Sequence, residues 1–216
     1  MTVSGPRIAS RSEWQRERAA LLAEEKALSR ALDRLAEQRR ALPWVRVDEP
    51  YRFDSEAGPV TLTELFGKNS QLVVYHFMFG PGWAEGCDGC SFVADHFDGA
   101  DLHLRHHDVS LVAVSRAPLA EFLPFKRRMG WRFAWVSSSG SDFNHDFGAT
   151  DAKDREQHGV SVFARDEAGR VFHTYSTYGR GVDLLIGAHN ILDLTPKGRN
   201  EASVMNWVRH HDRYAD

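Results

Sequence analysis

The sequence predicts an α/β fold: a three-layer α/β/α sandwich with a mixed sheet and a long N-terminal helix. Two observations lead to this prediction. Apolar strand-like runs alternate with helical patterns through the middle of the 216 residues, in the order β-α-β-α-β that builds a layered sheet. A hairpin pattern and a further helix follow this unit, and a hairpin adds antiparallel strands to parallel ones. We therefore expect one sheet with helices on both faces.

The composition is that of a globular protein with a substantial core. Apolar residues form 42% of the chain and charged residues 26%, which argues against wholesale disorder. The net charge of −3 provides no basic surface for nucleic acid or for an anionic membrane. No apolar run approaches the ~20 residues of a membrane-spanning helix, and residues 1–10 lack the apolar core of a signal peptide. The sequence predicts a cytoplasmic protein that binds neither nucleic acid nor membrane.

Residues 10–42 are predicted to form one long helix. Ser10 and Glu13 have the spacing of a capping box, and Pro43 ends the helix. Apolar residues recur at intervals of seven, whereas the row four positions further on is mostly charged, so only half of a coiled-coil seam is present. The apolar row is Trp14, Leu21, Leu28, Leu35 and Leu42. We predict a helical arm over residues 1–43 that packs on its own domain or, as we hypothesise, across a partner in a homodimer.

Residues 44–216 are predicted to form the α/β domain. An extended lead-in spans 44–70 and contains a short helix at 61–66. Residues 137–159 are polar and poor in strand signals, which indicates a long loop. The remaining predicted elements are strand 71–79, a helix from the cysteines to about Arg105 with an interruption at Gly99, strand 109–115, helix 118–129, strand 133–136, a hairpin of 160–163 with 171–175, and a helix at 182–192.

Cys87 and Cys90 are the only cysteines, and they form a CxxC where a buried strand gives way to a helix. The unpaired amides and the dipole at a helix start favour a thiolate, and the second sulfur lies about one turn further on. Two cysteines so placed can form a disulfide reversibly. We predict that Cys87 is the more exposed, more acidic nucleophile and that Cys90 resolves the mixed disulfide. The alternative is a pair of reduced cysteines packed as small apolar side chains.

Four further residues are candidates for the same site. Trp83 and Glu85 flank the cysteines, and Trp83 would serve as a substrate platform or as an anchor for the loop. His76 lies in the apolar strand that leads to the CxxC, so it either reaches the active end of the sheet or is a core histidine. Arg116 follows strand 109–115 and could lower a cysteine pKa or bind an anionic substrate such as glutathione; the alternative is an ordinary surface arginine.

A metal site is the main alternative use of the two cysteines. One CxxC supplies only two of the four ligands of a structural zinc, and no second CxxC or spaced histidine pair completes the set. Copper, as Cu(I) held by the thiolates of Cys87 and Cys90 together with His76, remains open. Apart from this alternative, the sequence predicts no cofactor.

Several segments of the chain resemble the DUF899 group of thioredoxin-like proteins, which are often labelled predicted dithiol-disulfide oxidoreductases or isomerases. The resemblance runs from the end of the first helix almost to the C-terminus, through residues 41–46, 73–81, 86–92, 112–118, 129–133, 141–144 and 172–176. It implies a thioredoxin-like fold in which the CxxC lies where the first central strand meets its helix. It also implies a thiol-disulfide oxidoreductase whose reductant is thioredoxin, glutathione or another thiol system.

The chain departs from thioredoxins at the cysteines themselves. Thioredoxins carry Trp-Cys-Gly-Pro-Cys, whereas Gly86 precedes Cys87 here and Asp88-Gly89 forms the spacer. The stretch 158–163, which corresponds to the place of the thioredoxin cis-proline, contains no proline. A thioredoxin-like way of holding a peptide substrate is therefore not expected.

The chain also lacks the loop of a peroxiredoxin, Pro-x-x-x-Thr/Ser-x-x-Cys. Pro81 lies six residues before Cys87 rather than seven, and Ala84 stands at the threonine position. We predict a thiol-disulfide oxidoreductase that is not a peroxidase of that type. A non-catalytic scaffold is the remaining alternative.

Overall fold

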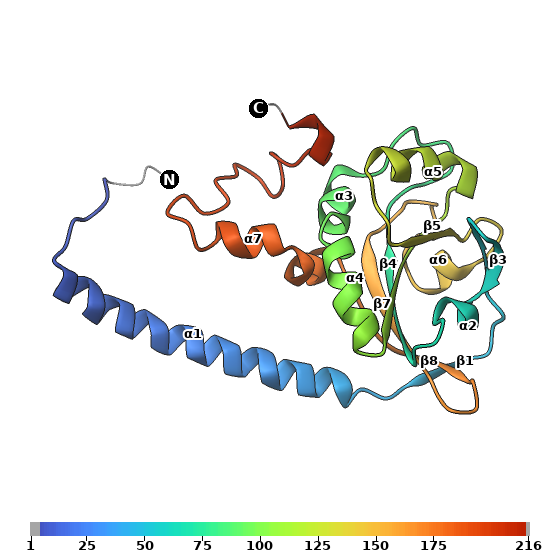
Figure 1. Cartoon of the computed structure of the whole chain (residues 1–216), viewed down its shortest axis with the longest axis horizontal. Coiled ribbons are helices and arrows are strands. Elements are labelled where there is room, and N and C mark those ends of the chain that lie inside the picture. Colours follow the sequence, from blue (N-terminus) through green and yellow to red (C-terminus); the bar gives the residue numbers. More distant parts are fainter. Residues whose placement is uncertain (1–4, 215–216) are drawn as a thin grey trace. The chain divides into compact units, whose positions relative to one another are not determined.

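The computed structural model describes residues 5–214 and divides the chain into two compact units, Met1–Pro43 and Trp44–Asp216 (Figure 1). The first unit contains a single long helix, α1 (Arg11–Arg40). Ser10 is its N-cap: the Ser10 Oγ accepts a hydrogen bond from the Glu13 amide, and the Glu13 carboxylate accepts one from the Ser10 amide at 2.8 Å. The predicted long helix and its capping box are confirmed.

The second unit is built on a mixed sheet, which within residues 5–214 has eight strands in the order β1-β8-β7-β4-β5-β6-β2-β3. The three central strands β4, β5 and β6 are parallel, and the antiparallel hairpin β7–β8 adds to β4. This is the predicted order of parallel strands followed by a hairpin. The strands are β1 (Val45–Val47), β2 (Arg52–Ser55), β3 (Gly58–Thr61), β4 (Gln71–His76), β5 (Val109–Ser115), β6 (Ala134–Ser137), β7 (Gly159–Arg165) and β8 (Val171–Tyr178).

The predicted extended lead-in over 44–70 contributes to both edges of the sheet. β1 pairs with β8 at one edge, and the β2–β3 hairpin joins β6 at the other through Asp54 and Ser137. Strands of three or four residues are too short to produce a recognisable alternation in sequence, so their pairing is fixed by the sheet they join. The short helix of this segment is α2 (Leu62–Leu65), capped by Thr61.

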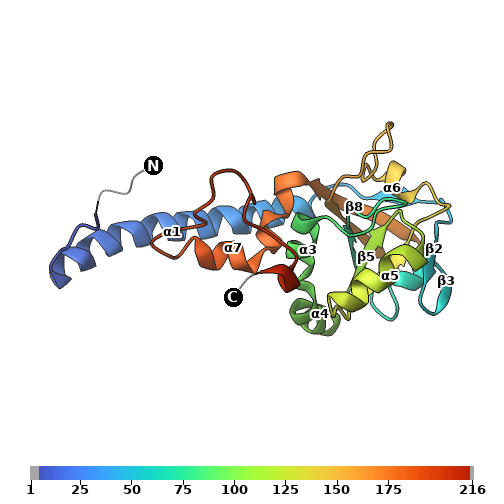
Figure 2. The ribbon, with the colours of Figure 1, turned by 90° about the horizontal axis from the view of Figure 1, so that it is seen from above.

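Helices cover both faces of the sheet, as predicted. On one face lie α3 (Asp88–Ala94), α4 (Phe97–His106), α5 (Leu119–Arg128) and α7 (Gly187–Leu192), and on the other α2 and α6 (Phe143–Asp146). Both views of the ribbon place α7 and the C-terminal segment beside α3 (Figures 1 and 2). The predicted helix at 182–192 is instead a 3₁₀ helix η1 (Gly179–Leu185) followed by α7, and a second short 3₁₀ helix, η2 (His211–Arg213), lies near the end.

The predicted helix after the cysteines is interrupted at His96 rather than at Gly99. The His96 amide bonds to the Val93 carbonyl, and its ring Nδ1 lies 2.8 Å from the Phe92 carbonyl oxygen that a regular helix would pair with this amide. The side chain thus takes the place of a helical hydrogen bond and separates α3 from α4. Gly99 lies inside α4, so it does not act as a breaker.

Each face of the sheet has its own apolar cluster. Alternation along β4 directs Tyr75 into the first cluster and Val74 into the second. The first cluster is strongly aromatic: Trp135 stacks on Phe122 with a centroid distance of 4.6 Å. Cys90 belongs to this first cluster, so the second cysteine of the CxxC is anchored in the aromatic core.

Candidate functional site

The two cysteines lie at the start of α3, where the loop that follows β4 enters the helix. Cys87 is the N-cap residue, and its amide donates a hydrogen bond to the Met78 carbonyl at 3.3 Å. The Ser91 amide and hydroxyl both bond to the Cys87 carbonyl at 2.9 Å, which fixes the backbone between the two sulfurs. Both cysteines are free thiols, with Cys87 partly exposed and Cys90 buried.

The two sulfurs differ sharply in acidity. A hydrogen bond from the Cys90 thiol lowers the pKa of Cys87 to about 6; the amides of Cys90 and Gly89 act in the same direction, and burial and the Asp88 carboxylate oppose them. Burial raises the pKa of Cys90 well above its ordinary value. The reduced site therefore contains a Cys87 thiolate that accepts a hydrogen bond from a protonated Cys90. Cys87 is the more exposed of the two sulfurs, and the direction of both pKa shifts agrees with the prediction that it is the more acidic thiol.

The C-terminal segment also contributes to the site, through the side chain of His210. The ring of His210 is buried, and its Nε2 lies 2.9 Å from the Gly86 carbonyl oxygen and 3.0 Å from an Asp88 carboxylate oxygen. Its Nδ1 lies 2.9 Å from the Arg128 guanidinium, so the hydrogen-bond pattern assigns the proton to Nε2, which donates, and Nδ1 accepts. This histidine holds the Gly86 carbonyl before Cys87 and contacts the Asp88 carboxylate after it.

Sequence reasoning missed His210 because it is separated from Gly86 by 124 positions in the chain. No spacing pattern connects residues so far apart, and the surrounding C-terminal residues have no strong periodicity. The same segment also covers α3: the Met205 sulfur lies 3.5 Å from the position of a β-carbon at Gly89, and Trp207 packs edge-on against Phe92 at 5.5 Å. Only contacts in the folded chain reveal this role.

Glu85 and Trp83 stabilise the loop that precedes Cys87. The Glu85 carboxylate accepts a hydrogen bond from Arg128 at 2.6 Å and also pairs with Arg213, and the hydrogen bond from Arg128 holds its pKa below the usual range. The Trp83 ring packs against Gly80 and is 39% exposed. Glu85 thus connects the CxxC loop to the C-terminal segment, and Trp83 anchors the loop while leaving part of its ring to solvent.

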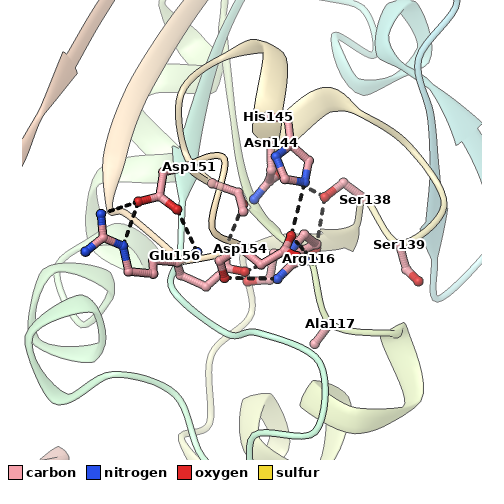
Figure 3. A network of polar contacts seen from close by, with 12 residues as sticks. Arg116, Ala117, Ser138, Ser139, Asn144, His145, Asp151, Asp154 and Glu156 are labelled. Atoms are coloured by element: carbon pink, nitrogen blue, oxygen red, sulfur yellow. Dashed lines mark hydrogen bonds and ion pairs between the residues drawn. The ribbon is translucent and has the colours of Figure 1, made fainter.

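Arg116 belongs to a polar network with the loop that contains Asp154 and Glu156 (Figure 3). Its guanidinium donates to Glu156 at 2.7 Å and to Asp154 at 3.1 Å, and the Glu156 side chain is almost fully buried. Two carboxylates therefore neutralise Arg116, and it is not among the main causes of the pKa shifts of either cysteine. The structure gives Arg116 the role of holding the 150–157 loop.

His76 faces the side of the sheet opposite to Cys90. Its Nε2 lies 2.8 Å from the Ser161 hydroxyl, its ring packs against Phe143 of the second cluster, and burial lowers its pKa to about 3. Of the two roles that the sequence allowed for His76, the structure shows that of a core histidine. The set Cys87, Cys90 and His76 is therefore not brought together, and within residues 5–214 no three His, Cys, Asp or Glu side chains are arranged to bind a metal ion.

The fold and the site define a thioredoxin-like protein: a mixed sheet flanked by helices, with a CxxC at the start of the helix that follows the first central strand. Residues 3–214 match the family described as bacterial protein of unknown function (DUF899), and the chain belongs to that family. No curated protein matches the chain. Within the described residues, no helix is both long and apolar enough to cross a membrane.

Solved structures with a similar fold include two bacterial proteins. PrxQ from Xylella fastidiosa is 14% identical, with a TM-score of 0.50 over 68% of this chain and 94% of that chain. A peroxiredoxin Q from Xanthomonas campestris is 13% identical, with a TM-score of 0.50 over 69% of this chain and 97% of that chain. At these identities the similarity establishes the thioredoxin-like fold and nothing about substrate.

Proposed function

We propose that the protein is a thiol-disulfide oxidoreductase that uses Cys87 as nucleophile and Cys90 as resolving thiol. The observation that carries the proposal is the pairing of an accessible Cys87 thiolate with a buried, protonated Cys90 one helical turn away. Such a pair supplies the two roles that disulfide reduction needs: one sulfur attacks the substrate, and the other later displaces the substrate from the mixed disulfide.

The reaction proceeds in two displacements. The Cys87 thiolate attacks one sulfur of a disulfide substrate, a mixed disulfide forms as the substrate S–S bond breaks, and the first substrate sulfur leaves as a thiolate. The Cys90 sulfur then attacks Cys87, the Cys87–Cys90 disulfide forms, and the second substrate thiol leaves with the proton from Cys90. Two electrons pass from the protein dithiol to the substrate, and a thiol reductant must return them.

Thioredoxin, glutathione or another thiol system is the proposed reductant, and we propose the cytoplasm as the location. Cytoplasmic thiol systems hold an exposed dithiol in the reduced form and regenerate it after each turnover. The partly exposed Cys87 supports this assignment, because an exchange partner must reach its sulfur. A metal-binding module is less well supported, since His76, the third ligand that the sequence suggests, faces the opposite side of the sheet.

Equilibration against glutathione buffers tests the proposed function. We expect a reversible intramolecular Cys87–Cys90 disulfide with a potential between about −270 and −180 mV, the range of thioredoxin to protein disulfide isomerase. Alkylation of the remaining thiols and mass spectrometry measure the oxidised fraction at each glutathione ratio. The Cys90→Ser variant is the control: it should stop at a glutathione adduct of Cys87, and the same variant should retain a physiological partner as a mixed disulfide. A scaffold without redox chemistry would form no intramolecular disulfide at any ratio.

We also propose that α1 mediates a homodimer. Leu28 is 62% exposed and Leu35 is 40% exposed, and both lie in the apolar row of a helix of 30 residues. A row of this kind is commonly buried against a partner, and a second copy of α1 provides a matching apolar row.

Sedimentation of variants in α1 tests the dimer. Leu28→Asp combined with Leu35→Asp is expected to convert a dimer into a folded monomer, because two buried carboxylates would face the apolar row. The matched control is Lys26→Asp with Arg30→Asp, which places two carboxylates on the opposite side of the helix and should leave the dimer intact. A wild-type protein that sediments as a monomer at tens of micromolar would contradict the proposal.

A further inference from the structure

Tyr75 has a buried hydroxyl for which the folded, reduced protein provides no partner. Its side chain is fully buried at the end of β4, and its hydroxyl oxygen makes no hydrogen bond within residues 5–214. A buried polar group without a partner costs stability, and phenylalanine would fill the same space without that cost. The hydroxyl therefore gains no hydrogen bond from the described residues in the reduced state, which raises the question of whether another state of the site uses it.

The hydroxyl lies beside the resolving cysteine. Tyr75 and Cys90 belong to the same apolar cluster, and the ring of Tyr75 is held edge-on by Phe97 at 5.1 Å and by Phe77 at 6.1 Å. In the reduced protein the Tyr75 hydroxyl lies close enough to the Cys90 sulfur for each group to influence the pKa of the other, but the two are not in hydrogen-bond geometry. Because its ring is held in place and its hydroxyl has no other partner among the described residues, Tyr75 can donate a hydrogen bond to Cys90 when Cys90 becomes a thiolate.

Cys90 needs such a donor at one step only. In the mixed disulfide, Cys87 carries no charge, and Cys90 must become a thiolate to attack it. Burial opposes this ionisation, while the Met78 backbone and the Tyr75 hydroxyl favour it by lowering the pKa of Cys90. Burial also raises the pKa of Tyr75 itself well above its ordinary value, so its hydroxyl stays protonated and acts as a donor.

We propose that Tyr75 is a positioning residue for the resolving step: its hydroxyl donates a hydrogen bond to the Cys90 sulfur as that thiol loses its proton. The bond between Cys90 and Cys87 then forms, the bond between Cys87 and the substrate sulfur breaks, and the substrate leaves as a thiol with the proton from Cys90. Tyr75 ends the step as it began, a neutral phenol. This inference rests on the proposed function, because a resolving step exists only if Cys87 forms mixed disulfides.

Dithionitrobenzoate separates the two steps in one experiment. Each attack releases one coloured thionitrobenzoate: the first release reports attack by Cys87, and the second reports resolution by Cys90. In Tyr75→Phe the second phase is expected to be about tenfold slower or more, as for loss of a hydrogen bond to a charged group, and its pH midpoint should move to higher pH. The first phase should stay within about twofold of wild type, because Tyr75 does not bond to Cys87.

Tyr51→Phe is the matched control. Tyr51 is also buried, but it lies in the cluster on the other face of the sheet, and its hydroxyl donates to Asp146 at 2.5 Å. Its loss should lower the free energy of unfolding and leave both phases unchanged. Tyr75→Phe should show the reverse pattern, with unchanged or higher stability and a slow second phase. A merely structural role for Tyr75 would not produce this pattern.

The possible failures are distinguishable. A wild-type protein with no first phase would overturn the proposed function, whereas a normal first phase and an unchanged second phase in Tyr75→Phe would overturn the role of Tyr75. A second measurement needs no exchange reaction: in Cys87→Ser protein labelled with ¹³C-cysteine, the NMR titration of Cys90 should move to higher pH when Tyr75 is replaced by Phe. An unchanged titration there would also overturn the inference.

Discussion

Iodoacetamide is expected to modify Cys87 at least about a hundredfold faster than Cys90 at pH 7. With a pKa of about 6, Cys87 is about nine-tenths thiolate at this pH, whereas burial keeps Cys90 protonated and out of reach. Because only the thiolate reacts, the Cys87 rate should be half-maximal near pH 6 and fall about tenfold for each unit below it. Quenched alkylation followed by peptide mass spectrometry measures both sites in one sample.

The cause of the low pKa is tested by Cys90→Ala. This change removes the thiol whose hydrogen bond is the main contribution to the acidity of Cys87, so the midpoint of the alkylation profile should move to higher pH. Asp88→Asn is the complementary variant: it removes a carboxylate that raises the pKa of Cys87, and the midpoint should move to lower pH. Faster labelling of Cys90 than of Cys87 in the reduced wild type would reverse the assignment of their roles.

What the sequence predicts well here depends on residues close together in the chain. The spacing of Cys87 and Cys90 at a strand-helix junction is local information, and it correctly predicts which sulfur is at the helix start and which is buried one turn further on. The capping box of α1 is equally local. The order of long apolar strands is also readable, because β4 and β5 are buried on both faces.

What the sequence does not predict depends on contacts between distant segments. The neighbour of a strand and the face a side chain occupies depend on register, and a shift by one residue would exchange Tyr75 with His76. The sequence leaves His76 open between the active end of the sheet and the core, and register places it in the core on the face opposite Cys90, whereas Tyr75 lies on the same face as Cys90. Arg116 ends the strand next to β4, but two carboxylates from a distant loop neutralise it. His210 reaches the site only because the C-terminal segment folds back over α3.

Gly86→Ala is expected to destabilise the protein and to disturb the nucleophile at the same time. A β-carbon at this position would lie 2.6 Å from one atom of the Phe77 ring and 2.9 Å from the Phe125 ring, well inside van der Waals contact. Both rings are buried in the aromatic cluster, where close packing opposes their displacement, so overpacking should lower the free energy of unfolding by about 1–3 kcal/mol. Urea denaturation of the reduced protein measures this loss.

The substitution should also shift Cys87. Alanine would push the backbone of residue 86 away from the two rings, this backbone is hydrogen-bonded to His210 through its carbonyl, and the next residue carries the reactive sulfur. The alkylation rate of Cys87 in Gly86→Ala should therefore fall even under conditions in which the protein remains folded. Gly99→Ala is the matched control: no atom lies within 4 Å of its β-carbon position, and alanine in the interior of α4 should add up to about 1 kcal/mol of stability. If Gly86→Ala were as stable and as reactive as Gly99→Ala, the result would contradict the close packing of the two phenylalanine rings against the CxxC loop.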